Sequence, residues 1–593
     1  MVRATREEFV PAPSLPLESG SHSPGLMRRR LLRVLNNREE LTRSAKASFR
    51  QHSQDGNVLL LEDLYKAVQK ICINLQIPPV FVEDPNVENV IKGFTRGNDE
   101  MTFREFFEFY YQLLSGIQTK YYPAKTVPWE RANHVGDFEL DGEDIRNFYD
   151  FGKRLGKGSF GVANLVKEKR SQAVRVCKTM RKDVNNLDIK QIRIEIDTLK
   201  LLDHPNVLKV YDIYNNNDKF YVIMENCRGD EFGKRFAKMF ANNQIPTEAY
   251  VNEMMHQILS AVNYIHAHKV VHKDLKPENI LFIDESPGSE IKIIDFGLAE
   301  HFSSSDEVLT RVAGSPHYMA PEVFGGEYDK RCDLWSVGCI MYYISTWRHP
   351  FIGRTREETA KKICKAKPDY SLIEHLSPVA QDFLRRLLVK NPKKRMDAPT
   401  ALAHEWFERF RLGKRAALRR DLTPAIRQNL EIFTKFPPLK AALVNLMAHQ
   451  LPHSSQVQHI TQVFHHLDSN EDGVLSEEEL SQGLTYCRFP TWSVVQILRT
   501  LDIDDSRSVS YTEFLAACYT WMDIDLKHLW SAFMRFDRDG NGKIELQEFK
   551  EIMGCSQHGR SIPEDKVRAM FREIDVDNNG VIEWKELEEY ISS

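Results

Sequence analysis

The feature that most constrains the fold of this chain is a repeat of acidic loops near its carboxyl end. The loops begin at Asp468, Asp502, Asp537 and Asp575, which are 34, 35 and 38 residues apart. Such a regular interval indicates one supersecondary unit repeated along the chain, in which neighbouring units pack together to bury their apolar faces. Residues 456–593 are therefore predicted to form a helical domain of four such units.

Three of the four loops carry oxygen ligands at the spacing that a calcium ion requires. In a twelve-residue calcium loop, side chains at positions 1, 3, 5, 9 and 12 and the carbonyl at position 7 surround the ion, and a glycine at position 6 makes the turn. The segments 468–479, 537–548 and 575–586 fit this pattern, and we expect each to bind Ca²⁺. The predicted ligands, with the position-7 residue acting through its carbonyl, are Asp468, Asn470, Asp472, Val474, Ser476 and Glu479; Asp537, Asp539, Asn541, Lys543, Glu545 and Glu548; and Asp575, Asp577, Asn579, Val581, Glu583 and Glu586.

The second loop, residues 502–513, departs from the pattern at its turn. Arg507 replaces the glycine, and the positive φ needed there costs a residue with a side chain about 1 kcal/mol. We expect this loop to bind calcium weakly or not at all. Its remaining predicted ligands are Asp502, Asp504, Ser506, Ser508, Ser510 and Glu513.

Residues 38–120 show helical periodicity and weaker traces of the same loop pattern. Two candidate loops keep their closing glutamate but have Gln51, Phe94 and Arg96 where ligands are needed. We interpret this region as a degenerate pair of EF-hand-like units that has lost metal binding. A plain helical bundle is the alternative. The retained glutamates are Glu62 and Glu105.

A glycine-rich turn opens the alternating strand-like and helical segments of residues 151–407. Glycines in a G-x-G-x-x-G turn let backbone N–H groups approach phosphates closely. Lys178 follows in the β-branched run AVRVCKTM, where it is placed to hold phosphate oxygens, and Glu195 is its expected carboxylate partner. A shifted register would put Arg175 in that place, but the spacing and the ammonium chemistry favour Lys178. The turn consists of Leu155, Gly156, Lys157, Gly158, Ser159, Phe160 and Gly161.

The ordered motifs HKDLKPEN (272–279), DFG (295–297) and APE (320–322) resemble those of eukaryotic protein kinases. The resemblance implies that Asp274 accepts the substrate hydroxyl proton, Lys276 contacts the transferred phosphate, and Asn279 and Asp295 hold Mg²⁺. It also implies an adenine slot formed by Ala163, Val176, Met224, Glu225 and Cys227, and a buried partner, Arg395, for Glu322.

Details of the same motifs imply a Ser/Thr-specific, basophilic kinase. DLKPEN is the serine/threonine form, with Ser315 placed to bridge Asp274 and Lys276. Glu231 and Glu278 stand where related kinases select basic residues, although both also suit ordinary surface carboxylates. Lys273 replaces a common arginine and loses its planar fork, which we expect to weaken a regulatory contact more than a catalytic one.

Kinase domain, connector and four EF-hands in this order resemble the calcium-dependent protein kinase family of plants and apicomplexan parasites. The fold class implied is multidomain, with an α+β two-lobed kinase fold, an all-α calmodulin-like domain and a small helical domain in front. The predicted domains are a disordered tail (1–37), the degenerate EF-hand-like domain (38–120), a linker (121–150), the kinase domain (151–407), an autoinhibitory junction (408–455) and the calmodulin-like domain (456–593).

The family resemblance further implies that the junction blocks the substrate face until calcium binds. Its basic start can lie against Glu231 and Glu278, and an ordinary solvated helix is the equal alternative. Pro437 and Pro438 are expected to end a helix there. The basic residues are Lys414, Arg415, Arg419 and Arg420.

Composition limits the remaining possibilities. A hydrophobic content of 42% and a net charge of −4 are ordinary for a globular protein and give no field that favours nucleic acid or a membrane. The nine cysteines form no CxxC pair, which predicts reduced thiols and a cytoplasmic location, and no transmembrane segment is expected. We expect a monomeric enzyme that uses ATP, Mg²⁺ and Ca²⁺ on protein substrates with basic residues near the acceptor. A calcium-sensing pseudokinase scaffold and a nucleotide-binding adaptor are the alternatives.

Overall fold

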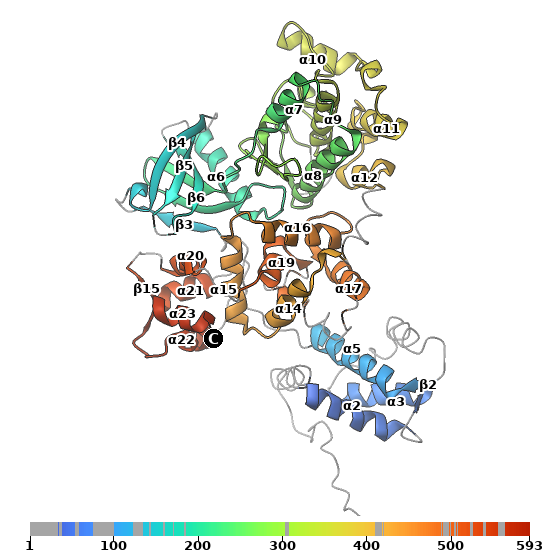
Figure 1. The fold of residues 1–593 in the computed structure, drawn as a ribbon, viewed down its shortest axis with the longest axis vertical. Helices are drawn as coiled ribbons and strands as arrows, with labels where there is room; N and C mark the ends of the chain where they lie inside the picture. The colour runs from blue at the N-terminus through green and yellow to red at the C-terminus, as the bar shows by residue number, and fades with distance from the viewer. Residues whose placement is uncertain are drawn as a thin grey trace, which may run out of the picture. The chain divides into compact units, whose positions relative to one another are not determined.

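The computed structural model divides the chain into two compact units, residues 1–126 with 489–496 and residues 127–488 with 497–593 (Figure 1). The structure describes residues 34, 38–53, 58–74, 100–121, 135–140, 144–157, 161–169, 171–182, 186–302, 308–408, 418, 420–487, 489, 497, 500–502, 506, 508–521, 526–537, 541–554 and 564–592. Most of the predicted tail, residues 1–37, lies outside these ranges. None of the described helices is long and apolar enough to cross a membrane.

The described part of the first unit consists of a helix–strand–helix arrangement, α2–β1–α3, followed by a strand and a helix, β2–α5, and the two short strands pair antiparallel. Val58 of β1 pairs with Thr102 of β2, and Phe49, Phe106 and Phe109 form part of the buried core. Glu105 accepts hydrogen bonds from the backbone N and hydroxyl of Thr102, at 2.9 and 2.8 Å. The elements are α2 (Arg38–His52), β1 (Val58–Leu60), α3 (Leu61–Asn74), β2 (Glu100–Thr102) and α5 (Phe103–Tyr121). Residues 54–57 and 94–99 of the two candidate loops, which include Phe94 and Arg96, lie outside the described residues, so the degenerate EF-hand pair stays an interpretation.

A six-stranded sheet, with one helix, forms the smaller lobe of the kinase region, drawn in cyan in Figure 1. The strand order is β3-β7-β8-β6-β5-β4, in which β3 runs parallel to β7 and the other neighbours are antiparallel. Side chains alternate across β6, so that Cys177 packs in the outer apolar cluster while Val176 packs in the main core. The elements are β3 (Gly136–Glu139), η3 (Ile145–Asn147), β4 (Tyr149–Lys157), β5 (Gly161–Glu168), β6 (Val174–Arg181), α6 (Asn186–Leu201), β7 (Val210–Asn215) and β8 (Lys219–Met224).

The prediction that residues 121–150 form a linker is wrong for the second half of this range. Residues 136–139 form β3, which joins the edge of the sheet beside β7, and β4 begins at Tyr149. A four-residue edge strand has too few positions to show a clear alternation of apolar and polar residues. Its partner strand lies about 75 residues further along the chain. Only the tertiary pairing therefore distinguishes it from a linker.

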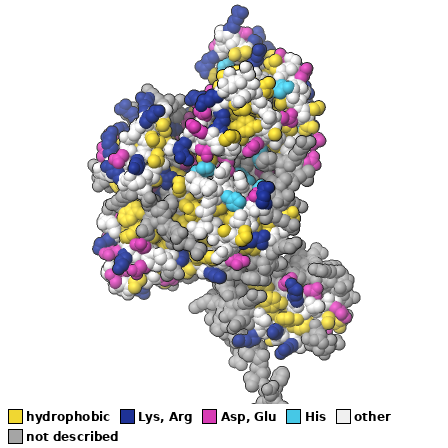
Figure 2. Space-filling view, viewed as in Figure 1, with side chains coloured by type: hydrophobic (Ala, Val, Ile, Leu, Met, Phe, Trp, Pro, Cys, Tyr) yellow, Lys and Arg dark blue, Asp and Glu magenta, His cyan; other side chains and the backbone are white. Residues whose placement is uncertain are grey.

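The larger lobe is helical and is built around α8 and α9, most of whose residues are buried. It ends at Trp406 and Phe407, which pack into the same core. Figure 2 shows acidic and basic side chains interspersed over the face drawn, with Lys and Arg side chains gathered over α10 at its top. The elements are α7 (Phe232–Ala241), α8 (Glu248–Ala267), β9 (Val270–Val271), η4 (Pro277–Asn279), β10 (Ile280–Phe282), β11 (Ile291–Ile293), β12 (Glu300–His301), η5 (Val323–Gly325), α9 (Arg331–Thr346), α10 (Arg356–Lys365), η6 (Tyr370–Ile373), α11 (Pro378–Leu387), η7 (Pro392–Lys394), α12 (Ala398–Leu402) and η8 (Glu405–Phe407).

Two helices connect the kinase region to the calcium loops. α14 (Pro424–Phe433) ends shortly before the Pro437–Pro438 pair, and α15 (Pro438–His449) starts at it, because proline fits the first turn of a helix but not its interior. Residues 441–450 are all buried, as expected for a helix that is apolar around its circumference. α15 contacts both α19 and α20, so it joins the two halves of the calcium region.

The calcium region contains two pairs of helix–loop–helix units, each joined by a short antiparallel strand pair. β13 pairs with β14 and β15 with β16. The elements are α16 (Ser455–Leu467), β13 (Leu475–Ser476), α17 (Glu477–Tyr486), β14 (Ser508–Val509), α19 (Tyr511–Cys518), α20 (Leu526–Phe536), β15 (Lys543–Glu545), α21 (Leu546–Gly554), α22 (Glu564–Ile574), β16 (Val581–Glu583) and α23 (Trp584–Ser592).

Candidate active site and calcium loops

Lys178 lies between two carboxylates on the inner side of the sheet. Its Nζ donates to Glu195 Oε1 at 2.6 Å and to Asp295 Oδ1 at 3.1 Å. Burial alone would lower the pKa of Lys178, but the two carboxylates outweigh it and raise that pKa above its ordinary value. Burial would likewise raise the pKa of Asp295, but the neighbouring ammonium lowers it overall. Lys178 and Asp295 are therefore held charged, as required to bind phosphates and a divalent cation.

Arg175, the alternative for the role of Lys178, projects to the other side of the sheet. Its guanidinium donates to the Gln450 carbonyl at 3.0 Å and lies 3.6 Å from the centre of the Tyr211 ring. Strand alternation separates it from Lys178, which is three residues further along β6. Arg175 thus holds the end of α15 and is unavailable to nucleotide.

The glycine-rich turn joins β4 and β5 as predicted for a strand–turn–strand segment. Gly156 pairs with Ala163 and Lys157 with Val162. A side chain at Gly161 would bring its Cβ within 2.3 Å of the Thr179 carbonyl, so the glycine is required for β5 to pack on β6. Leu155 is exposed at 51%. The predicted residues Gly158, Ser159 and Phe160 lie outside the described residues.

The predicted adenine residues line up across neighbouring strands. Val176 pairs with Met224, and Ala163 pairs with Lys178. The side chain of Glu225 makes structural contacts, because its carboxylate accepts from Lys209 N at 2.6 Å and pairs with Lys292 at 3.0 Å. Any contribution of Glu225 to nucleotide must come from its backbone. Cys227 packs against the main core, and burial raises the pKa of its thiol.

The catalytic loop is a network centred on Asp274. Its Oδ1 accepts from Ser315 N at 2.9 Å, and its Oδ2 accepts from Lys276 Nζ at 2.5 Å and Asn279 Nδ2 at 3.2 Å. Lys276 also donates to Ser315 Oγ at 2.9 Å, so Ser315 bridges Asp274 and Lys276. The carboxylate is thereby fixed in orientation at the mouth of the loop, where a substrate hydroxyl can approach it.

Asp333 supports this loop and was not among the residues predicted from sequence. It is fully buried in α9 and accepts from the backbone N of His272 and of Lys273, both at 2.9 Å, and from His266 Nε2 at 2.8 Å. Burial alone would raise the pKa of Asp333, but these hydrogen bonds and the nearby histidines lower it. A lone aspartate within the apolar run 332–345 was the available signal.

Lys273 is paired inside the protein. Its Nζ donates to Glu300 Oε2 at 2.6 Å and lies 5.6 Å from the Tyr328 ring, and only 2% of its side chain is exposed. Its backbone has a φ of 69°, held by the hydrogen bonds to Asp333. Lys273, which stands where related kinases have an arginine, thus forms an ion pair with Glu300 of β12, and its own side chain is buried.

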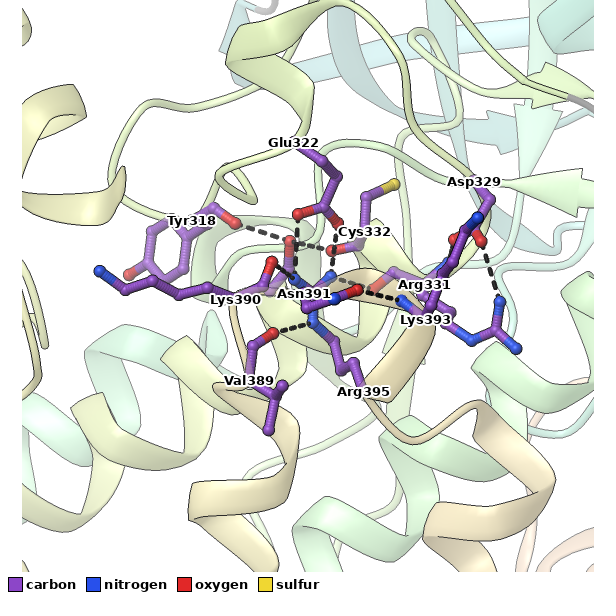
Figure 3. Close-up of polar contacts among 11 residues, drawn as sticks. Tyr318, Glu322, Asp329, Arg331, Cys332, Val389, Lys390, Asn391, Lys393 and Arg395 are labelled. Atoms are coloured by element: carbon purple, nitrogen blue, oxygen red, sulfur yellow. Dashed lines mark hydrogen bonds and ion pairs between the residues drawn. The ribbon is translucent and has the colours of Figure 1, made fainter. Parts of the chain in front are cut away.

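Glu322 and Arg395 form the expected buried ion pair (Figure 3). NH1 and NH2 of Arg395 donate to the two carboxylate oxygens at 2.5 and 3.0 Å, as a planar bidentate pair. The same guanidinium donates to the Val389 and Arg331 carbonyls, each at 2.9 Å. This cluster ties the APE segment to the residues that follow α11.

Three calcium loops share one turn geometry. The glycines at position 6 have φ values of 80°, 84° and 88°, which only glycine adopts without strain. Each glycine N–H donates to the first aspartate of its loop, at 3.0, 2.9 and 3.2 Å. Oxygens of Asp575, Asp577 and Glu586 lie within 4.8 Å of one another, which fits a hard cation. The glycines are Gly473, Gly542 and Gly580.

The second loop is only partly described. Asp502 Oδ1 accepts from Ser506 N at 2.9 Å, and Glu513 caps α19 together with Ser510. Asp504 and Arg507, and Asp539 of the third loop, lie outside the described residues. The low affinity expected for this loop stays a prediction.

The first calcium loop packs directly on the kinase region. Glu471, at position 4, accepts from His256 Nε2 at 2.8 Å, and its carbonyl accepts from Asn263 Nδ2 at 2.7 Å, with all three side chains buried. A side chain at Gly473 would collide with Tyr264 and His204, at 2.4 and 2.6 Å. The first calcium loop therefore packs closely against α8.

The exit helix of the second loop is capped by the kinase region. Asp203, which follows α6, accepts from Thr512 N and Oγ1 at 2.9 and 2.8 Å. A carboxylate at a helix N-terminus satisfies free N–H groups and complements the helix dipole. Arg535 of α20 forms an ion pair with Asp212 and donates to the Tyr211 carbonyl at 2.7 Å.

Of the four basic residues predicted to block the substrate face, only Arg420 is described. It pairs with Asp421 at 3.0 Å, whereas Glu231 pairs with Lys234 at 2.8 Å. Among the described residues Arg420 makes no ion pair with Glu231 or Glu278, and the blocking role of the basic residues stays a prediction. Lys414, Arg415 and Arg419 lie outside the described residues.

Comparisons with known proteins agree with these two sites. The description "Protein kinase domain" matches residues 149–407, and "EF-hand domain pair" matches residues 457–519 and 526–592. The chain is 35% identical to calcium-dependent protein kinase 6 of Plasmodium berghei over 540 residues, which cover 90% of this chain and 35% of that protein.

Two further relatives are covered over most of their length. Calcium-dependent protein kinase 5 of Plasmodium falciparum is 34% identical over 457 residues, covering 75% of this chain and 78% of that protein. Calcium-dependent protein kinase 8 of Arabidopsis thaliana is 30% identical over 459 residues, covering 75% and 83%. The chain thus spans about a third of the Plasmodium berghei relative but more than three quarters of these two.

Proposed function

The chain belongs to the calcium-dependent protein kinase family, and from this premise we propose that it transfers the γ-phosphate of ATP to serine or threonine in protein substrates when Ca²⁺ binds. The observation that carries the proposal is the complete catalytic set. Lys178 bridges Glu195 and Asp295, and Asp274 is oriented by Ser315 and Asn279. A pseudokinase scaffold would not need this set intact.

The roles of the individual residues follow from phosphoryl-transfer chemistry, in which the protein mainly positions groups and neutralises charge. Asp295 and Asn279 would hold Mg²⁺, which neutralises the phosphates, and Lys178 would hold the phosphate oxygens. Asp274 accepts the proton of the substrate hydroxyl. Lys276, bound to both Asp274 and Ser315, links the acceptor side to the phosphate side.

Calcium control is proposed to act through the docked calcium region. Loop 1 presents Glu471 to His256, and the second unit presents Thr512 to Asp203, just after the helix that carries Glu195. A calcium ion that favours these loop shapes would favour the docked state. A shift from 1% to 99% docked requires about 5.5 kcal/mol of differential affinity, which several loops together supply more readily than one.

The substrates proposed are proteins with basic residues near the acceptor. Glu231 immediately precedes α7, Glu278 lies in η4 next to the catalytic loop, and Glu278 is exposed. We also propose that the enzyme is a monomer, to be checked by light scattering. A cytoplasmic location is proposed from the cysteines, since seven of them are free thiols among the described residues.

The deciding experiment is a phosphate-transfer assay on an arginine-containing serine peptide, first with Ca²⁺ and then with a chelator. Transfer should occur with Ca²⁺ and fall at least tenfold with the chelator. Asp274→Asn should abolish transfer yet bind ATP nearly as the parent does, because Asp274 orients the acceptor and holds no nucleotide. Transfer by Asp274→Asn within tenfold of the parent would contradict the assignment. No transfer by the parent would leave the scaffold alternative.

A further inference from the structure

The short strand β3 touches two different parts of the molecule with its two faces. It lies before residues 149–407, the range that the protein kinase domain matches, and it pairs in parallel with β7 at the edge of the sheet. Side chains alternate between the faces of a strand, so Gly136 and Phe138 lie on one face and Asp137 and Glu139 on the other. The two faces therefore have separate partners.

The face that carries Asp137 is turned toward α6, the helix that bears Glu195. Asp137 Oδ2 forms an ion pair with Lys200 Nζ at 2.5 Å, and Lys200 lies in the last turn of α6. Val135, just before β3, is 6% exposed and belongs to the same buried core as Leu199 of α6. The carboxyl end of α6 is thus tied to β3 by an ion pair and shares its core.

The position of α6 matters because its Glu195 must meet Lys178. Glu195 is 2% exposed and lies five residues before Lys200 on the same helix, a rise of about 7.5 Å. A second anchor holds α6 near its middle, where the Thr198 hydroxyl and Nε2 of His301 in β12 are 2.8 Å apart. The helix is therefore held by β12 at one point and by β3 at another.

The other face of β3 lies against the calcium region. The Phe138 ring stacks on Tyr214 at 5.0 Å, and the Arg535 guanidinium of α20 lies 5.9 Å from the centre of the Phe138 ring. A side chain at Gly136 would collide with this guanidinium and with the Asp212 carboxylate that pairs with it. β3 therefore contacts α20 on one face and α6 on the other.

We propose that Asp137 is a positioning residue of the kinase, through which β3 transmits the docking of the calcium region to α6. Arg535, seated on Gly136 and Phe138, holds the strand against β7, and Asp137 then fixes Lys200 and the helix that carries Glu195. As an edge strand of four residues, β3 is paired on one side only, so it loses this support when the calcium region leaves. This inference rests on the proposed kinase function and specifies how calcium control reaches the active site.

The test measures kinetics of the full-length chain on one serine peptide with saturating Ca²⁺. Asp137→Asn and Lys200→Gln should each lower kcat at least fivefold while KM for the peptide changes less than twofold, because the Lys178–Glu195 pair serves the nucleotide. The double variant should be no slower than the slower single variant, since both substitutions remove one interaction. Lys200→Arg keeps the charge and should stay within twofold of the parent.

Gly136→Ala tests the opposite face of the strand in a calcium titration. Its methyl group displaces Arg535, so half-maximal activity should require at least threefold more Ca²⁺ than in the parent. An unchanged calcium requirement would overturn the link between β3 and the calcium region.

The matched control is Glu139→Gln, because Glu139 lies on the same face of β3 as Asp137 but accepts from Asn215 of β7 instead of reaching α6. It should leave kcat and the calcium requirement unchanged. The proposal is overturned by a loss below twofold in both neutral variants, by additive losses in the double variant, or by an equal loss in Glu139→Gln. If one neutral variant folds poorly, the other decides, because each removes the same ion pair. A parent that transfers no phosphate with Ca²⁺ would instead refute the proposed function.

Discussion

At the scale of single residues, Lys273 shows how a common motif position is used differently. The usual arginine is replaced by a lysine whose Nζ is 2.6 Å from Glu300 and whose side chain is 2% exposed. Because the pair is buried on the lysine side, removing the charge leaves Glu300 without its cation. The ion pair therefore contributes more to the free energy of unfolding than an exposed ion pair does.

We expect Lys273→Met to reduce kcat and to destabilise the kinase region by about 1–3 kcal/mol, the range for leaving a partly buried charged group without a partner. Lys273→Arg should remain close to the parent, because it keeps the charge and the bond to Glu300. Steady-state kinetics and thermal unfolding measure both effects. Equal behaviour of the two variants would show that the ion pair has no role.

Glu290 gives a residue-scale prediction about pH. Burial raises its pKa to about 7, so the folded chain holds this proton over a range in which the unfolded chain has lost it. The stabilising effect of the neutral form is complete below about pH 4.3, the pKa of an unfolded glutamate, and is lost as the pH rises through 7.

Glu290→Gln, which is neutral at every pH, should therefore raise the melting temperature relative to the parent more at pH 8 than at pH 4.5. Scanning fluorimetry of the two proteins in parallel measures the difference, and the comparison cancels the other titrating groups. A difference that does not change with pH would mean that Glu290 ionises normally.

At the scale of elements, the calcium loops are separate units that share one hydrogen-bonding pattern. The position-12 carboxylate closes each loop on itself, since Glu586 accepts from Val576 N and Glu583 N, each at 2.9 Å, and Glu548 accepts from Glu545 N at 2.9 Å. The same oxygens are the bidentate ligand of a bound calcium ion.

Glu548→Gln and Glu586→Gln should each weaken calcium binding at their own loop by at least tenfold, because one charge and the bidentate grip are lost together. Arg507→Gly should strengthen calcium binding at the second loop, because glycine adopts the positive φ expected at position 6 without cost. Calorimetry should find three strong sites in the parent and one weaker site. Four equivalent sites in the parent would contradict this ranking.

At the scale of the whole molecule, the kinase region and the calcium region are packed as one unit. The contacts come from both halves of the calcium region: Glu471 and Thr512 from the first pair, and Arg535 from the second. α15 joins the two halves, and its terminal His449 donates to the Val210 carbonyl at 2.8 Å. The calcium region is thus placed to support the segment that follows the Glu195 helix.

A chain ending near Phe410 keeps the kinase core, because Trp406 and Phe407 are buried within it. It loses the partners of Asp203, His256 and Asp212. We expect its activity to fall at least tenfold below that of the calcium-loaded full chain and to be insensitive to calcium, measured on the same peptide. Full activity without calcium would instead mean that the connector acts only as an inhibitory block.

The sequence alone determined the parts whose chemistry is local. Gly473, Gly542 and Gly580 adopt the positive φ that their loops require, and each loop is contained in twelve residues. The ordered kinase motifs likewise identified Asp274, Lys178 and Glu195, and Pro437–Pro438 marked the break between α14 and α15. Such features depend on spacing along the chain, which a sequence displays directly.

Only the tertiary structure decided which long-range partners these residues have. Asp333 holds the catalytic loop from 60 residues away, β3 joins the sheet beside a distant strand, and Thr512 is capped by Asp203 across 309 residues. Strand alternation placed Arg175 and Lys178 on opposite faces, so that Lys178 reaches Glu195 while Arg175 reaches Gln450. Pairings of this kind depend on which surfaces come into contact after folding. The residues next to a carboxylate or an edge strand in the sequence do not identify its partner.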